Sequence, residues 1–246
     1  SANNNRIPKS PDIVKIGTSY YLYFSLSKET DANESAIFCV RTTDLEYAVE
    51  NKDWQDVGMV ISSCGYNSDT QQKYRYDESY ATDPSVFFDK DGGLFMAYGS
   101  YYGREKIFGG IYLLELNPKT GLLKDGGNIN SKGEIISTLH GKKIYKTGVL
   151  LARPGTAFGL SAEEGSIISE CELYYDDVAD YYYLFVTYGE EEGSYNIRYA
   201  RSRNAAGPYL DYNGENLSEF SSEKNKNQYS KGTYLIGGYT NGKEVL

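Results

Sequence analysis

Short runs of aromatic and β-branched residues, separated by turn residues, dominate the pattern of hydrophobic and polar positions. Residues 19–25, 85–88, 94–98 and 181–186 have the composition of β-strands. Gly, Asp and Lys fill the gaps, as in residues 89–93, and this composition is typical of hairpin loops. No long stretch carries a sustained helical period with caps at both ends. The pattern therefore predicts an all-β protein.

One arrangement of strands recurs along the chain. Its three copies begin near Ser10, Asp83 and Glu170, and each has a first strand, a turn, an aromatic second strand and a third strand. A further strand follows the first two copies. Three or four strands per repeat, repeated radially, are typical of a β-propeller. With six prolines and no Pro- or Ser-rich linker, we expect residues 1–246 to form a single domain.

The repeat makes one position in each copy important. The innermost strand of a propeller blade lines the central channel, so equivalent positions converge near the axis. Aligned on their strands, Ser10, Asp83 and Glu170 occupy the same repeat position. Two carboxylates that are far apart in the sequence would then face one pocket. The alternative is that Asp83 is only a turn residue before a proline and Glu170 only a solvated residue at a strand edge.

Composition narrows the classes of partner and chemistry. The formal net charge is −9, and an acidic surface repels phosphate, so nucleic acid and anionic membranes are disfavoured. No apolar run approaches the ~20 residues that cross a bilayer, which argues against membrane insertion. The three cysteines (Cys39, Cys64 and Cys171) form no CxxC motif, and we expect buried thiols. His140 is the only histidine, which disfavours a histidine-based zinc site.

Five segments stand in an order that is characteristic of one enzyme family. They are Ser10-Pro11-Asp12-Ile13 with the strand 20–23, Ala81–Phe87, Tyr98–Tyr102 with 109–111, Ser169-Glu170 before the strand 181–186, and 195–198 with 207–211. Together they resemble the motifs of glycoside hydrolase family 43, in particular its endo-α-1,5-L-arabinanase-like branch. The resemblance implies a five-bladed β-propeller and an inverting glycosidase that cleaves arabinan in plant polysaccharides. An arabinofuranosidase or xylosidase of the same family is the nearest alternative.

The resemblance implies a catalytic role for two acids. Glu170 corresponds to the general acid, and Asp83 to the carboxylate that raises the pKa of that acid and orients the sugar. Inversion needs a neutral carboxyl to protonate the leaving oxygen and a second carboxylate, ~6.5–9.5 Å away, to activate water. Glu172 stands where the family usually has a proline. Because even spacing along a strand places two side chains on one face, Glu172 is the reserve candidate for the acid.

Candidate sugar-binding residues follow from the same motifs. Sugar rings present apolar C–H faces that stack on aromatic rings. Tyr102 occupies the position of a tryptophan in the family and is the first candidate for stacking, with Tyr101, Phe158 and Ser100 beside it. Arg198 could hold a carboxylate in the pocket, although a salt bridge at a strand edge is equally compatible with its position.

Two departures from the family pattern concern the ends of the chain. The catalytic base of the family lies on the first blade, upstream of Ser10, and residues 1–9 contain no carboxylate. The Gly-Pro-Gly-His segment of the last blade is also missing before Leu246, and His140 does not replace it. Five blades at the observed repeat length would need more than 246 residues. We therefore expect a truncated propeller, or one that a companion chain or segment completes.

The remaining expectations concern cofactor, function class and location. No cofactor is required and no metal ligand is assigned, although family members can hold a single calcium ion near the propeller axis. A non-catalytic glycan-binding propeller is a second hypothesis. It is motivated by the absent base, by Lys9 where the family has a tryptophan and by Glu172 where it has a proline. A structural or protein-binding propeller is a third hypothesis. Because polymeric substrates are met outside the cytoplasm, an oligo- or polysaccharide partner implies an extracellular, periplasmic or cell-surface location.

Overall fold

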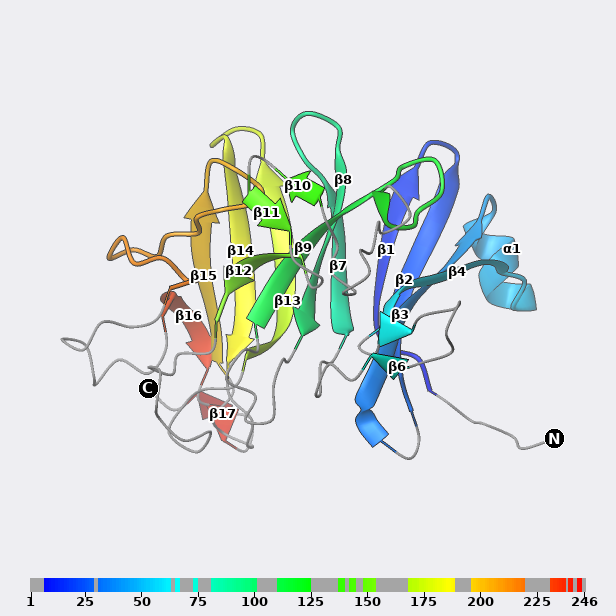
Figure 1. Cartoon of the computed structure of the whole chain (residues 1–246), viewed down its shortest axis with the longest axis horizontal. Helices are drawn as coiled ribbons and strands as arrows, with labels where there is room; N and C mark the ends of the chain where they lie inside the picture. Colours follow the sequence, from blue (N-terminus) through cyan, green and yellow to red (C-terminus); the bar gives the residue numbers. More distant parts are fainter. Residues whose placement is uncertain are drawn as a thin grey trace.

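Three antiparallel four-stranded sheets stand next to one another in the computed structural model of the chain (Figure 1). The structure describes residues 7–28, 31–62, 65–66, 73–74, 81–100, 110–124, 137–139, 142–144, 148–153, 168–188, 196–219, 231–237, 239–240 and 243–244. The predicted all-β class is confirmed for this part of the chain.

The first sheet is formed by consecutive strands. Its order is β1 (Lys9–Ile16), β2 (Ser19–Lys28), β3 (Asp31–Thr42) and β4 (Gln55–Ser62). A short helix, α1 (Leu45–Asn51), connects β3 to β4. It begins at Asp44, whose side chain accepts a hydrogen bond from the N–H of Tyr47 and so caps the first turn. With only seven residues, α1 is too short to give the helical period that sequence patterns reveal.

The second and third sheets repeat this arrangement. The second contains β7 (Thr82–Phe88), β8 (Leu94–Ser100), β9 (Gly110–Leu116) and β12 (Val149–Ala152), and the third contains β13 (Ile168–Asp176), β14 (Tyr181–Tyr188), β15 (Asn196–Ser202) and β16 (Thr233–Gly237). Three two-stranded ribbons accompany them: β5 (Gly65–Tyr66) with β6 (Lys73–Tyr74), β10 (Ser137–Leu139) with β11 (Lys142–Ile144), and β17 (Tyr239–Thr240) with β18 (Lys243–Glu244).

The first strands of the three sheets lie together, as the blades of a propeller require. β7 packs against β1 on one side and against β13 on the other. Side chains bind backbone groups across both boundaries: the Asp12 carboxylate accepts from the N–H of Val86, and the Ser85 hydroxyl accepts from the N–H of Leu173. Large buried side chains fill the layers between the sheets, among them Tyr23, Tyr98, Phe95, Leu113 and Tyr182.

The three first strands also carry the same irregularity near their beginnings. The register shifts at residues 10–11 of β1, 83–84 of β7 and 169–170 of β13, so that two residues face one on the partner strand. The alignment of Ser10 with Asp83 is therefore confirmed. Counted from the pairs that follow the bulge, however, Glu170 corresponds to Pro84, one position later than the sequence alignment had placed it. Ser169-Glu170 has no proline to mark the bulge, which explains the error.

Candidate active site

Asp83 and Ser10 meet at the boundary between the first and second sheets. Each lies in the bulge of its strand with a positive φ, 53° for Asp83 and 49° for Ser10. The Ser10 hydroxyl donates a hydrogen bond to Oδ1 of Asp83. The bulges thus turn both side chains out of their strands and toward one another.

The pKa of Asp83 responds to its burial, to two hydroxyl groups and to the charge of Glu170. Burial raises the pKa of Asp83, hydrogen bonds from Ser10 and Thr82 oppose that rise, and the negative charge of Glu170 adds to it. The net effect is a pKa above the ordinary value of an aspartate. The charges of two acids from different sheets therefore influence one another. The side chain of Glu170 is exposed, which leaves its carboxyl open to solvent.

Two further carboxylates lie next to this pair. Burial raises the pKa of Asp12 against hydrogen bonds from the N–H groups of Val86 and Ile13. The pKa of Glu172 is also raised, first by burial and then by the charge of Asp12, while a hydrogen bond with Ser85 opposes the rise. Glu172 is exposed, yet its carboxyl is affected by Asp12 of β1 and Ser85 of β7.

The charges of all four carboxylates act on Cys171. Burial holds the pKa of its thiol far above the usual range, and the charges of four carboxylates reinforce this effect: Asp83, Glu172, Asp12 and Glu170. The Cys171 Sγ also lies 4.0 Å from the carbonyl oxygen of Asp83. The thiol therefore stays protonated at neutral pH, and the four acids whose charges act on it come from all three first strands. The expectation of a buried cysteine is met at Cys39 and, less completely, at Cys171.

The predicted sugar-binding residues are only partly described. Ser100 is buried at the end of β8, opposite Gly110. Arg198 lies on β15, where its Nε donates to Oδ1 of Asn196 and its guanidinium donates to the carbonyl of Gly232 and covers the ring of Tyr234. These contacts tie Arg198 to the outer strands of its sheet. Tyr101, Tyr102, Phe158, Cys64 and His140 lie outside the described residues.

Sequence reasoning missed two members of the site. Asp12 was recognised only as part of a motif, and Ser10 only as a repeat position, although its alignment with Asp83 was the available signal.

The described residues contain no group of three or more His, Cys, Asp or Glu side chains that could hold a metal ion, so the calcium ion near the axis gains no support. None of the described helices is long and apolar enough to span a membrane.

Comparison with known proteins places these residues in a family context. The model of glycosyl hydrolases family 43 matches residues 1–236. An extracellular endo-α-(1→5)-L-arabinanase of Thermotoga petrophila is 34% identical over 216 residues, which are 85% of this chain and 38% of that protein. The extracellular endo-α-(1→5)-L-arabinanase 2 of Bacillus subtilis is 31% identical over 90% of this chain and 41% of its own length.

The solved structures agree with the sequence comparison. The crystal structure of endo-1,5-α-L-arabinanase from Thermotoga petrophila RKU-1 aligns with a TM-score of 0.64 and 27% identity, over 94% of this chain and 44% of that chain. The chain thus spans about two fifths of the length of these curated relatives.

Proposed function

Because this chain belongs to glycosyl hydrolase family 43, we propose that it contributes the general acid to an inverting glycosidase that cleaves arabinan in the manner of an endo-α-1,5-L-arabinanase. The names of its relatives support the substrate, and the interaction of Asp83 with Glu170 supports the chemistry. The relatives are named as extracellular, which favours action outside the cytoplasm.

Each acid has a separate task in this proposal. Glu170, open to solvent at the start of β13, protonates the glycosidic oxygen as the bond to the leaving sugar breaks. Asp83, half-buried and fixed by Ser10, stays charged beside it and orients the sugar. The observation that carries the proposal is that β7 and β13, which bear Asp83 and Glu170 near their beginnings, pack against one another. The effect of the Glu170 charge on the pKa of Asp83 agrees with this arrangement.

The catalytic base belongs to a part of the protein beyond the three sheets. An inverting site needs a carboxylate on the other side of the sugar, ~6.5–9.5 Å from the acid. Residues 1–9 supply none. We propose that a further segment or companion chain carries the base and adds the blades of a five-bladed, single-domain propeller, consistent with relatives more than twice as long as their matching part.

Hydrolysis of linear arabinan by the full-length protein tests the function. Glu170→Gln keeps the shape of the side chain but cannot donate the proton, so we expect the release of reducing ends to fall by at least about 100-fold. Glu46→Gln, an exposed change in the first turn of α1, is the matched control and should retain full activity. NMR of the first product should show inversion at the anomeric carbon, and the product sizes separate endo from exo action.

Two results would contradict this assignment. Full activity of Glu170→Gln together with loss in Glu172→Gln would make the reserve candidate the acid. Tight binding of arabinan by calorimetry without any hydrolysis would favour a non-catalytic glycan-binding propeller.

A further inference from the structure

Ser10 and Asp83 share an uncommon backbone conformation. Both are non-glycine residues with positive φ, at equivalent positions of adjacent first strands, and both precede a proline. Positive φ is rare outside glycine, and the following proline disfavours the right-handed helical region for the residue before it. Strained positions of this kind persist where the surrounding structure holds them, and they cluster at functional sites.

The strained conformation brings a donor to an acceptor across the sheet boundary. A carboxylate accepts through both oxygens when it is ionised, so a hydroxyl that donates to it favours the charged form. Ser10 provides this bond from β1, and Thr82 provides another from β7 itself. The neighbouring Ser25 donates to the Lys9 carbonyl at 3.1 Å and lies 3.3 Å from Oγ1 of Thr82, which anchors the backbone just before Ser10.

The other groups that face Asp83 act in opposite directions. The charge of Lys9, on β1, favours the ionised carboxylate, whereas the charge of Glu170, on β13, and burial oppose it. The thiol of Cys171 is neutral and adds no charge. Without the hydrogen bond from Ser10, burial and the charge of Glu170 would raise the pKa of Asp83 further.

We propose that Ser10 is a positioning residue, whose hydroxyl fixes the Asp83 carboxylate beside Glu170 and keeps it charged. This inference rests on the proposed function, because it gives Ser10 its importance through Asp83. Ser10 takes no part in bond breaking itself. It links the first sheet to the acid pair of the second and third sheets.

The test compares two variants that remove the hydroxyl in different backbone contexts. Ser10→Ala keeps the strain of the positive φ, whereas Ser10→Gly relieves it, since glycine adopts this conformation freely. Carbon-13 NMR follows the titration of the Asp83 carboxyl in the full-length protein, with Asp83→Asn to assign its signal. We expect Asp83 to titrate at higher pH in both variants than in the wild type.

The rate profile provides the functional readout. If Asp83 must be charged, the acidic limb of kcat/KM for arabinan moves to higher pH in both variants, with a loss of about tenfold on that limb that shrinks as the pH rises. Ser202→Ala is the control, because it removes another buried hydroxyl, bonded to the N–H of Asn204 in the third sheet. It should leave both the titration and the profile unchanged.

The outcomes separate the two proposals. An unchanged Asp83 titration in both Ser10 variants overturns the role of the Ser10 hydroxyl. A shift in Ser10→Ala but not in Ser10→Gly would assign the effect to backbone strain, which also overturns that role. The titration does not depend on activity. If the wild type fails to hydrolyse arabinan while the titration shifts, the proposed function fails and the coupling of Ser10 to Asp83 stands.

Discussion

Three acidic side chains near the boundaries of the sheets make the stability of the fold depend on pH. Asp12, Asp83 and Glu172 all have a raised pKa, with burial as the main cause in each. The folded chain therefore binds protons more tightly at these positions than the unfolded chain does. The stability that they contribute is fully present below the unfolded pKa values and is lost as the pH rises through the raised ones.

Glu172→Gln measures how much the charge of Glu172 contributes to the free energy of unfolding. Glutamine keeps the size and a hydrogen bond to Ser85, but removes the repulsion from Asp12 and the cost of a partly buried charge. We expect the free energy of unfolding at pH 7 to rise by on the order of 0.5 kcal/mol, a small value because Glu172 is partly solvated. Urea unfolding at pH 7 and pH 4 measures it, and the gain should disappear at the lower pH. A less stable variant at pH 7 would show that the Glu172 carboxylate is favourably held instead.

Cys171 should behave as an unreactive thiol. The thiolate is the reactive form, and burial together with four neighbouring carboxylates keeps the pKa of Cys171 far above its usual range. We expect iodoacetamide at pH 8 to leave Cys171 unmodified in the folded protein and to alkylate it in urea. Peptide mass spectrometry distinguishes the two states. Rapid labelling of the native protein would mean that the acids do not surround the sulfur.

At the scale of elements, the sequence patterns predicted strands well and their irregularities poorly. The aromatic and β-branched composition and the turn residues located the strands such as β2 and β14, because both signals are local. The bulge at 83–84 could be inferred from its proline and its repeat partner at 10–11, whereas the one at 169–170 has no such mark. The contact between Asp12 and Val86 depends on how two sheets pack, which no local pattern encodes.

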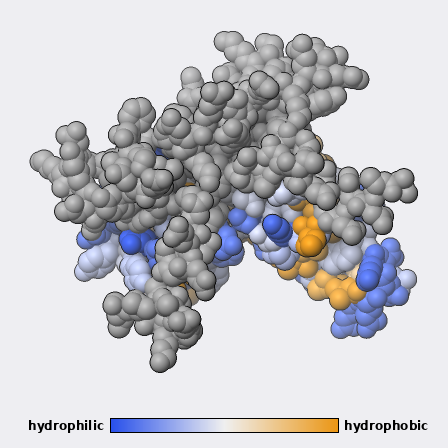
Figure 2. Space-filling model, turned by 90° about the horizontal axis from the view of Figure 1, so that it is seen from below, coloured by the Kyte–Doolittle hydropathy of each residue, from blue (hydrophilic) through white to orange (hydrophobic). Residues whose placement is uncertain are grey.

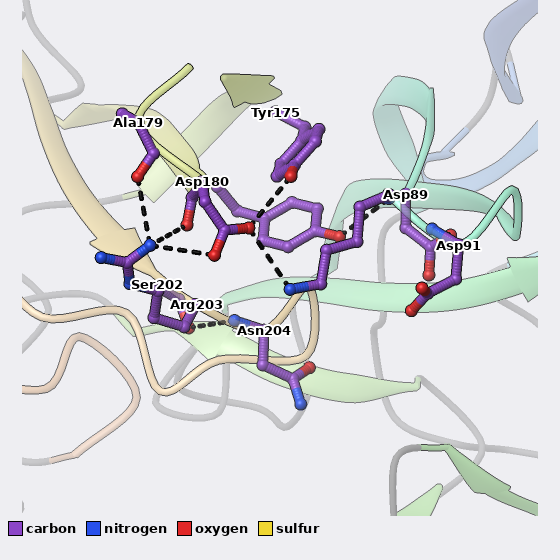
Figure 3. A network of polar contacts seen from close by, with 10 residues as sticks. Asp89, Asp91, Tyr175, Ala179, Asp180, Ser202, Arg203 and Asn204 are labelled. Atoms are coloured by element: carbon purple, nitrogen blue, oxygen red, sulfur yellow. Dashed lines mark hydrogen bonds and ion pairs between the residues drawn. The ribbon is translucent and has the colours of Figure 1, made fainter. Parts of the chain in front are cut away.

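The turn between β13 and β14 connects the third sheet to the second at the end of β13 that is opposite to Glu170. Figure 3 shows Asp180 at the centre of this network. Its carboxylate accepts from the Tyr175 hydroxyl at 3.0 Å, from Nζ of Lys90 at 3.3 Å and from Arg203 at 3.0 Å. Lys90 belongs to the turn between β7 and β8, so its ion pair crosses from one sheet to the next.

Asp180→Asn should therefore loosen this connection in a pH-dependent manner. The Tyr175 hydrogen bond, followed by Lys90, lowers the pKa of Asp180, so its contribution to stability is present above the unfolded pKa and is lost as the pH falls through the lowered value. We expect a lower Tm at pH 7 and a difference that shrinks toward pH 2. Asp177→Asn is the control, because Asp177 lies in the same turn but is not one of the partners of the Asp180 carboxylate given above. An equal loss in both variants would attribute the effect to the turn alone.

At the scale of the whole molecule, the first sheet presents an apolar outer face. Ile13, Phe24, Phe38 and Met59 lie on this face by the pairing of their strands, and the rings of Phe24 and Phe38 stack with centroids 6.2 Å apart. Ile13 and Met59 are 45% and 53% exposed. Figure 2 shows hydrophobic side chains gathered on the side of the molecule where this sheet lies. Apolar faces of this kind mark surfaces that another element covers, which agrees with the proposal that the propeller has further blades.

This face leads to a prediction for residues 1–246 produced alone. The dye anilinonaphthalene sulfonate should bind them strongly, and the double change Ile13→Lys and Met59→Lys should reduce its fluorescence at least about twofold, because charge on the face prevents the dye from replacing water. Val49→Lys, on the exposed side of α1, is the control and should have no effect. If the proposed further blades are supplied, as a longer chain or as a companion chain, they should abolish the signal in the unmodified sequence. Strong dye binding that survives when those blades are present would mean that no further blade covers the first sheet.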